Sequence, residues 1–295
     1  IKDGNVSVSS DGGMMDLGLS QILPFKRDPG DRNRTSPFAF TGNRFEFRAV
    51  GSSQSVSGPL VAMNTILADS LAWIAEKLEA ELSGGKAIPA AVATVLQELM
   101  REHGDVVFGG NGYSEEWHAA AVEERGLRNL PTTADALPVL REQAVIDLFE
   151  RTGVLSPVEL ESRYEVYAEQ YILSIGVEAK LVVELAKTVI YPATMSYVSS
   201  LAATVNSASY LGVELKPAGI KKIAEETNAM MATVAQLEEA LVNHHFESTE
   251  AHMKYCAGPL RSLMDKVRKH ADALEVEVAD EYWPLPKYRE MLFIR

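Results

Sequence analysis

Three charged side chains share one face of a short predicted strand near the start of the chain. Read with a period of two, the sequence RFEFRAV places Arg44, Glu46 and Arg48 on one side and the intervening phenylalanines on the other. The phenylalanines predict a buried back for this strand, which we place at residues 43–50. The charged front is unusual, because ion pairs on an exposed sheet face contribute only roughly a few tenths of a kcal/mol.

More cations lie just upstream of this strand. The segment KRDPGDRNRTSP carries Lys26, Arg27, Arg32 and Arg34, in a chain with 28 Lys and Arg against 41 Asp and Glu. Arginine forks match carboxylates and phosphates, and a carboxylate among phosphates commonly ligates magnesium. The pattern around Glu46 therefore favours a site for an anionic substrate and a divalent cation, although an ordinary exposed ion-pair face remains the alternative.

Composition excludes several other classes of function. The chain has 295 residues and a formal net charge of -13, which argues against a general nucleic-acid surface. A single cysteine, Cys256, excludes an internal disulfide and a cysteine zinc site and favours a cytoplasmic protein. We find no uncharged apolar run of about 18 residues and expect no membrane partner. Because IKDGNVSVSSDGG has neither an initiator Met nor a signal-peptide pattern, we expect a fragment.

Helical periodicity dominates after residue 55. Ser57-Gly-Pro59 predicts a helix start, Gly84-Gly85 its end, and Pro192 an interruption of a later helix. The fold class expected is α+β and predominantly α-helical, with a small β segment followed by a large antiparallel helical region. The predicted helices are 57–83, 89–102, one that begins after the N-cap Ser114, 134–151 and 156–207, followed by two more within 216–245 and 248–278. The predicted domains are 1–55, 56–155 with a loop at 103–114, and 156–295.

The charged strand also resembles a known family. NRTSPFAFTGNRFEFRAVGSS is similar to the last active-site strand of glutamine synthetases. Together with the ending EYWPLPKYREMLFI, it resembles the type III glutamine synthetases, the long-chain bacterial branch. The resemblance is strong over residues 31–54 and over the last 15, and it extends through the helical region between, including NGYSEEWH.

The resemblance implies a role for each charge. Glu46 matches the glutamate that ligates the divalent metal, Mg²⁺ or Mn²⁺, and Arg48 matches the arginine that holds the substrate glutamate. Arg34 matches the catalytic arginine that stabilises the γ-phosphate of ATP, and Arg44 matches an ATP-phosphate contact. Ala39 stands where better-known bacterial enzymes carry a further arginine, so this chain departs from the family pattern there.

The family resemblance also implies a reaction and partners. ATP phosphorylates the side-chain carboxylate of glutamate, and ammonia then displaces the phosphate to give glutamine. A homo-oligomer of stacked rings, a hexamer-based dodecamer, is expected. Most of the family's metal carboxylates and its ammonium site lie upstream of the strand, so we expect this chain alone to be inactive. The alternative is a non-catalytic helical oligomerisation or interaction module.

Three further motifs have alternative interpretations. Trp117 in NGYSEEWH is either a packing anchor, or the motif forms a surface loop against the mouth of the active site or a neighbouring subunit. His244, His245 and His252 are favoured as packing and surface residues over a metal site, because no i, i+4 pair of histidines is formed. The tail WPLPKYREMLFIR is expected to dock on the body, since a free tail would expose large apolar side chains.

Overall fold

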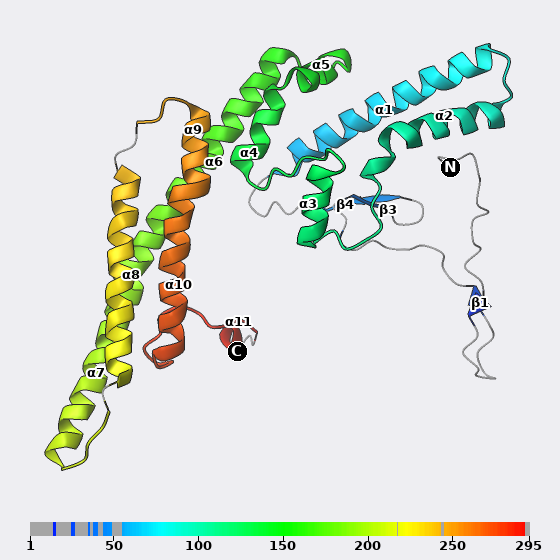
Figure 1. Ribbon diagram of the computed structural model, residues 1–295. Helices are drawn as coiled ribbons and strands as arrows, with labels where there is room; N and C mark the ends of the chain where they lie inside the picture. Colours follow the sequence, from blue (N-terminus) through cyan, green and yellow to red (C-terminus); the bar gives the residue numbers. More distant parts are fainter. Residues whose placement is uncertain are drawn as a thin grey trace. The chain divides into compact units, whose positions relative to one another are not determined.

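A computed structural model of the protein confirms a predominantly helical α+β fold (Figure 1). It divides into two compact units, residues 1–130 with 144–157 and residues 131–143 with 158–295. The predicted domain boundaries at residues 55 and 155 stay predictions. The residues that the structure describes are 14–15, 25–26, 35, 38–40, 44–48, 55–216, 218–242 and 245–292.

The β structure of the first unit consists of two antiparallel pairs. β1 (Met14–Met15) pairs with β2 (Phe25–Lys26), and β3 (Phe38–Phe40) pairs with β4 (Phe45–Phe47). The strand predicted at 43–50 is therefore observed as the three residues of β4, with Arg48 directly after it and residues 49–50 outside the described part.

The prediction that the aromatic back of this strand is buried is wrong for the chain by itself. Phe45 is 58% exposed and Phe47 is 39% exposed. A hairpin of three-residue strands is too small to bury its own face, and among the described residues the rings instead pack on each other, with Phe38 stacked on Phe45 at 4.8 Å between centroids. Among the hairpin residues whose exposure is described, Ala39 is buried, at 1% exposed.

The helices of the first unit begin and end where local signals place them. α1 and α2 lie side by side and run antiparallel (Figure 1). Gly85 follows α1 with a φ of +85°, and the residue after it donates to the carbonyl of Glu81, which is the arrangement that favours glycine at a helix end. The helices of this unit are α1 (Ser57–Ser83), α2 (Ile88–His103), α3 (Glu115–Glu123) and α5 (Gln143–Arg151).

Helix α1 has an apolar surface that few other residues cover. By length and composition it could cross a membrane, with a mean hydropathy of 1.2 over a window of which 6% is buried. One such helix is weak evidence for a membrane span. The same helix carries Asp69, which forms an ion pair with Arg151 of α5. The prediction of no membrane partner stays a prediction.

The helix predicted at 134–151 is broken in the structure. α4 (Thr133–Ala136) is followed by a 3₁₀ turn (Leu137–Arg141), an extended Glu142 and then α5. Pro138 explains the break, because proline has no N–H to continue an α-helical ladder and favours a new helical start. Thr132 caps the short α4 by accepting from the backbone N–H of Asp135.

The second unit is an antiparallel array of long helices with two π-helical segments. One segment, Ala186–Ile190, lies just before Pro192, and the other, Cys256–Leu260, contains Pro259. Both prolines lack the donor that a regular helix needs, so the ladder widens by one residue there. The interruption predicted at Pro192 is therefore confirmed. The helices are α6 (Pro157–Leu185), α7 (Tyr191–Tyr210), α8 (Ala218–Val242), α9 (Thr249–Tyr255), α10 (Arg261–Glu277) and α11 (Tyr288–Leu292).

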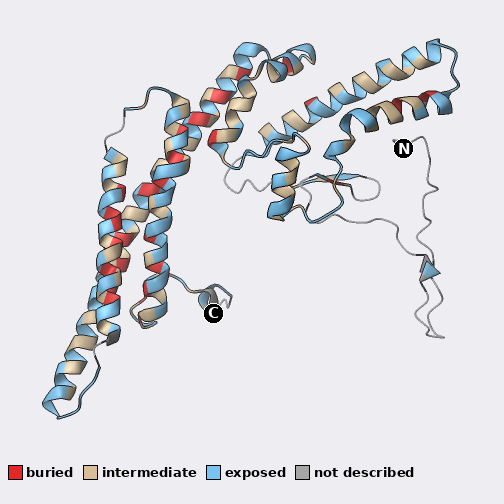
Figure 2. Ribbon diagram, in the orientation of Figure 1, coloured by how far each residue is buried: buried red, intermediate tan, exposed pale blue. Residues whose placement is uncertain are grey.

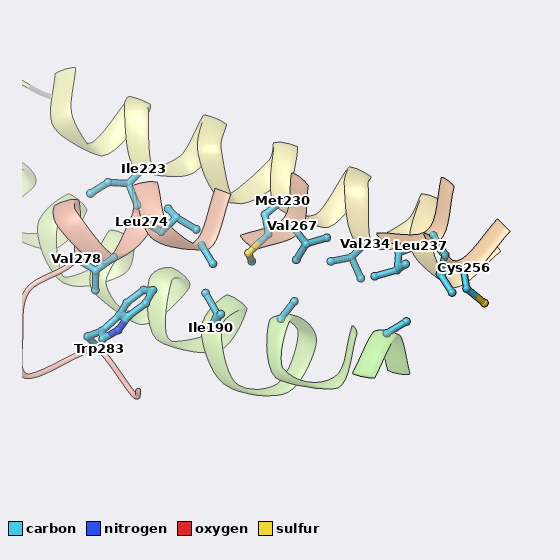
Figure 3. Close-up of a cluster of buried hydrophobic side chains, with 14 residues drawn as sticks. Ile190, Ile223, Met230, Val234, Leu237, Cys256, Val267, Leu274, Val278 and Trp283 are labelled. Carbon is cyan, nitrogen blue, oxygen red and sulfur yellow. The ribbon is translucent and has the colours of Figure 1, made fainter. Parts of the chain in front are cut away.

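The main core of this unit lies along the seam between α8, α10 and the α6–α7 rod. Figure 2 shows buried residues concentrated along these facing sides, and Figure 3 shows Met230 of α8 beside Val267 of α10 and Leu237 of α8 beside Cys256. All four are 2% exposed or less. Cys256 belongs to the same cluster, and burial raises the pKa of its thiol.

Asp69→Asn is expected to lower stability at neutral pH and to have less effect in acid. Arg151 donates to both carboxylate oxygens of Asp69 at 2.8 Å. This hydrogen bonding lowers the pKa of Asp69 below its usual 3.8. The pair therefore stabilises the folded state above that value, and its contribution disappears as the pH falls through the lowered pKa.

Urea unfolding midpoints at pH 7 and at pH 3 test this expectation. At pH 7 the difference in urea midpoint between wild type and Asp69→Asn should be small, because the pair is half-exposed. At pH 3 this difference should be smaller still. A gap that is equal at both pH values would contradict the assigned cause.

Candidate functional site

Glu46 of β4 forms an ion pair with Arg48, the residue directly after the strand. Nη2 and Nε of Arg48 donate to Oε2 of Glu46 at 2.6 and 3.2 Å. The Arg48 side chain is 29% exposed and that of Glu46 is 43% exposed. Residues two apart on a strand point to the same side, which is why this pair forms locally. Taken alone, the geometry is that of an ordinary ion pair on a strand surface.

The residue opposite Glu46 in the hairpin is small. Ala39 pairs with Glu46 across the ladder. The family resemblance leads one to expect an arginine at this position, and the chain has a methyl group there. Arg48, directly after β4, places a guanidinium beside Glu46. Arg48 thus directly contacts the predicted metal-binding carboxylate.

The structure describes one of the other two predicted site residues. Arg44 stands at the bend before β4, and it is exposed. Arg34 lies outside the described residues. The structure therefore joins Glu46 and Arg48 and leaves the predicted ATP contacts of Arg34 and Arg44 as predictions.

The described residues supply an incomplete set of metal ligands. Across the described part of the chain, no group of three or more His, Cys, Asp or Glu side chains lies together. Magnesium prefers six oxygen ligands, and Glu46 is a single carboxylate. The histidine region also has a packing explanation, because His252 stacks on Phe246 with ring centroids 4.1 Å apart. His244 lies outside the described residues.

Sequence reasoning missed a contact between the turn before the hairpin and a distant glycine loop. Oγ1 of Thr35 accepts a hydrogen bond from the backbone N–H of Gly112 at 2.6 Å. The same hydroxyl donates to the carbonyl of Gly110 at 3.4 Å. The sequence signal was the run GGNG at 109–112, which overlaps the start of NGYSEEWH, the motif interpreted as a possible loop against the active-site mouth.

The glycine loop is held by helix α3 and by a stacked aromatic pair. Ser114 caps α3 by accepting from the N–H of Trp117 at 3.2 Å. The Trp117 ring stacks on Phe108 at 3.6 Å between centroids. Arg125 lies 4.8 Å from the Trp117 ring and donates to the carbonyls of Asp105 and Val107. Trp117 is therefore a packing anchor, and the loop that it holds contacts the turn at Thr35.

Known glutamine synthetases are similar to this chain over most of its length. Residues 91–209 match the family model described as "Glutamine synthetase C-terminal domain". The type-3 glutamine synthetase of Dictyostelium discoideum is 39% identical over 95% of the chain, and a glutamine synthetase of Bacteroides fragilis (strain YCH46) is 33% identical over 95%. A glutamine synthetase of Butyrivibrio fibrisolvens is 32% identical over 92%.

The chain spans 39% of the length of each of these relatives. The similarity covers the hairpin, the glycine loop and the helical array alike, since it extends over at least 92% of the chain. The ion pair alone does not identify a family. The family assignment rests on the match to the C-terminal domain and on the similarity to a type-3 enzyme. The chain belongs to the glutamine synthetase family and is homologous to the C-terminal region of its type-3 members.

Proposed function

We propose that this chain is the C-terminal part of a glutamine synthetase that ligates ammonia to L-glutamate at the expense of ATP. The observation that carries the proposal is 39% identity to a type-3 glutamine synthetase over 95% of the chain. In the proposed reaction, the γ-phosphoryl group of ATP is transferred to the glutamate side chain. Ammonia then attacks the γ-glutamyl phosphate, and glutamine, ADP and phosphate are released.

The residues of the hairpin would act by electrostatics in this reaction. Arg48 would hold the carboxylate of the substrate glutamate, and Arg34 and Arg44 would neutralise the phosphates of ATP. Glu46 would be one ligand of a Mg²⁺ or Mn²⁺ ion, which supplies charge neutralisation at the transferred phosphoryl group when bound. The ion pair supports these roles, because Arg48 keeps Glu46 oriented and can exchange it for a substrate anion.

The Glu46–Arg48 pair is suited to such an exchange. Half-exposed ion pairs contribute about 0–1 kcal/mol, since water and salt compete for both partners. Replacing Glu46 by a substrate carboxylate at Arg48 would therefore cost little, and the freed Glu46 carboxylate would be available to a cation. A deeply buried pair would oppose this exchange by several kcal/mol.

We further propose a homo-oligomer of stacked rings, a hexamer-based dodecamer, to which the long helices contribute contacts. A stripe at helical spacing on α6 supports this role, because Leu173, Val177 and Leu181 are 50–68% exposed. A non-catalytic interaction role for the helical array is compatible with the same surface. The cytoplasmic location and the absence of nucleic-acid and membrane partners also stay proposals.

An activity assay on the full-length protein and on the 295-residue chain tests the proposal. The full-length protein should form glutamine and ADP from glutamate, ammonium and ATP, should lose activity on chelation with EDTA, and should regain it with Mg²⁺ or Mn²⁺. The 295-residue chain should be inactive, because Glu46 is one ligand where several are needed.

Two outcomes would contradict this proposal in different ways. Glutamine formation by the 295-residue chain would refute the view that its site is incomplete. No ATP-dependent glutamine formation by the full-length protein with either metal would refute the ligase function. Light scattering on the same preparation tests the assembly, and a monomeric full-length protein would exclude the rings.

A further inference from the structure

We propose that the contact between Thr35 and Gly112 is a positioning device, which fixes the β3–β4 hairpin for the reaction. The inference rests on the proposed ligase function, because it concerns the placement of Glu46 and Arg48. Thr35 stands three residues before β3, and the residue before it in the sequence is Arg34. A restraint on Thr35 therefore acts at the base of the hairpin.

The hairpin needs such an external restraint. Its strands have three residues each, and two-stranded hairpins are marginal without a further packed layer. Phe38, Phe45 and Phe47 are 36–58% exposed, so burial anchors these rings only in part. The contact at Thr35 bridges 77 residues of sequence and ties the hairpin base to the loop before α3.

Glycine at position 112 is required by the close approach of Thr35. A Cβ atom at Gly112 would lie 2.7 Å from the carbonyl oxygen of Thr35 and 3.1 Å from its hydroxyl. The nearest clashing atom belongs to the backbone, which cannot rotate away as a flexible side chain would. Any larger residue at 112 must therefore displace either the loop or the turn that carries Thr35.

The loop is rigid enough to transmit this restraint. The carbonyl of Gly112 lies 3.1 Å from Nε2 of His118 in α3. Asn111 accepts from the N–H of Tyr113 at 3.1 Å, which closes a local turn. The Ser114 cap and the Phe108–Trp117 stack described above hold the two ends of the loop. These contacts hold the backbone N–H of Gly112 in place, from which Oγ1 of Thr35 accepts its hydrogen bond.

Four variants of the full-length protein test the positioning role. Thr35→Val keeps the shape and removes both hydrogen bonds, whereas Thr35→Ser keeps the hydroxyl. Gly112→Ala introduces the clash, whereas Gly109→Ala is its matched control in the same loop, because its Cβ would have no atom within 4 Å. The readouts are kcat, KM for ATP and glutamate, and amide hydrogen exchange over residues 38–47.

Thr35→Val and Gly112→Ala are expected to lower kcat by about 10- to 100-fold, since misplacement of reacting groups by about 1 Å has effects of that size. Hydrogen exchange over residues 38–47 should become faster in both. Thr35→Ser and Gly109→Ala should stay within about threefold of wild type. Rescue by serine separates positioning from a packing role of the threonine methyl group.

Each other result overturns the proposal. Unchanged exchange over residues 38–47 in Thr35→Val and Gly112→Ala would show that the contact does not hold the hairpin. Faster exchange with a wild-type kcat would show that the hairpin position does not matter for the reaction. The exchange readout needs no activity, so it remains decisive if the full-length wild type makes no glutamine, which would refute the proposed function instead.

Discussion

Glu46→Gln in the full-length protein is expected to lower kcat for glutamine formation by about 100- to 1000-fold, the size seen when one group that stabilises transition-state charge is removed. The substitution keeps the shape of the side chain and removes its negative charge. A neutral amide is a weaker cation ligand than a carboxylate, and it releases Arg48 from the ion pair at Oε2. The measurement is steady-state kinetics at saturating Mg²⁺ or Mn²⁺, with the apparent metal affinity determined alongside.

Stability distinguishes this effect from a general loss of structure. The Glu46–Arg48 pair is half-exposed, and such pairs contribute about 0–1 kcal/mol. The thermal unfolding midpoint of Glu46→Gln should therefore stay within a few degrees of wild type. A kcat loss of the expected size without a matching loss of stability assigns Glu46 to the chemistry.

Glu98→Gln provides the matched control. Glu98 pairs with Lys77 at 2.6 Å, the same distance as in the Glu46–Arg48 pair, and its side chain is 42% exposed against 43% for Glu46. Losing this pair should leave kcat and metal affinity unchanged. If Glu46→Gln also retains wild-type kcat and metal affinity, Glu46 is a surface residue and not a ligand.

Local signals made the helix ends predictable. The end of α1 at Gly85 and the start of α3 at Ser114 depend on contacts within five residues of each position. The break inside 134–151 was missed, although Pro138 is visible in the sequence, because the apolar periodicity continues across it. Proline is favoured at the start of an α-helix and also at the start of a 3₁₀ turn. The residues around Pro138 therefore did not distinguish the two.

The candidate site was predictable in residue type and less so in geometry. The alternation in β4 correctly placed Glu46 and Arg48 on one face, because strand geometry has a period of two. The predicted burial of Phe45 and Phe47 is not observed, because burial requires a second packed layer, which an alternating strand does not by itself provide. The Thr35–Gly112 contact was not predictable, because it joins residues 77 positions apart without complementary charge or apolar periodicity.

The C-terminal tail docks in part, as its apolar residues suggested. Trp283 is 8% exposed and packs in the main core, where Figure 3 shows it beside Val278. Tyr282 packs on Tyr197 with ring centroids 5.2 Å apart. The prediction is wrong for Met291 and Leu292, which are 61% and 75% exposed, and residues 293–295 lie outside the described part of the chain. Two prolines redirect the chain after Trp283, and the short α11 leaves these side chains exposed.

Trp283→Ala is expected to destabilise the second unit by about 3–5 kcal/mol, the usual cost of emptying a buried aromatic site. The indole lies on the seam of the core, so its removal leaves a cavity beside α10 and frees the tail. Urea unfolding of the protein measures the change, and limited proteolysis should cut the freed tail faster. Leu292→Ala, at an exposed position, should stay within about 0.5 kcal/mol of wild type.

Trp283→Phe separates the apolar contribution of the ring from that of its N–H group. Among the described residues, Nε1 of Trp283 is buried without a hydrogen-bond partner. Phenylalanine removes this unsatisfied donor, whose burial is itself unfavourable, and keeps most of the apolar contact. The expected loss is therefore below about 1.5 kcal/mol. Equal losses for the two Trp283 variants would show that the indole N–H has a stabilising partner, and wild-type stability of Trp283→Ala would show that tail docking does not stabilise the unit.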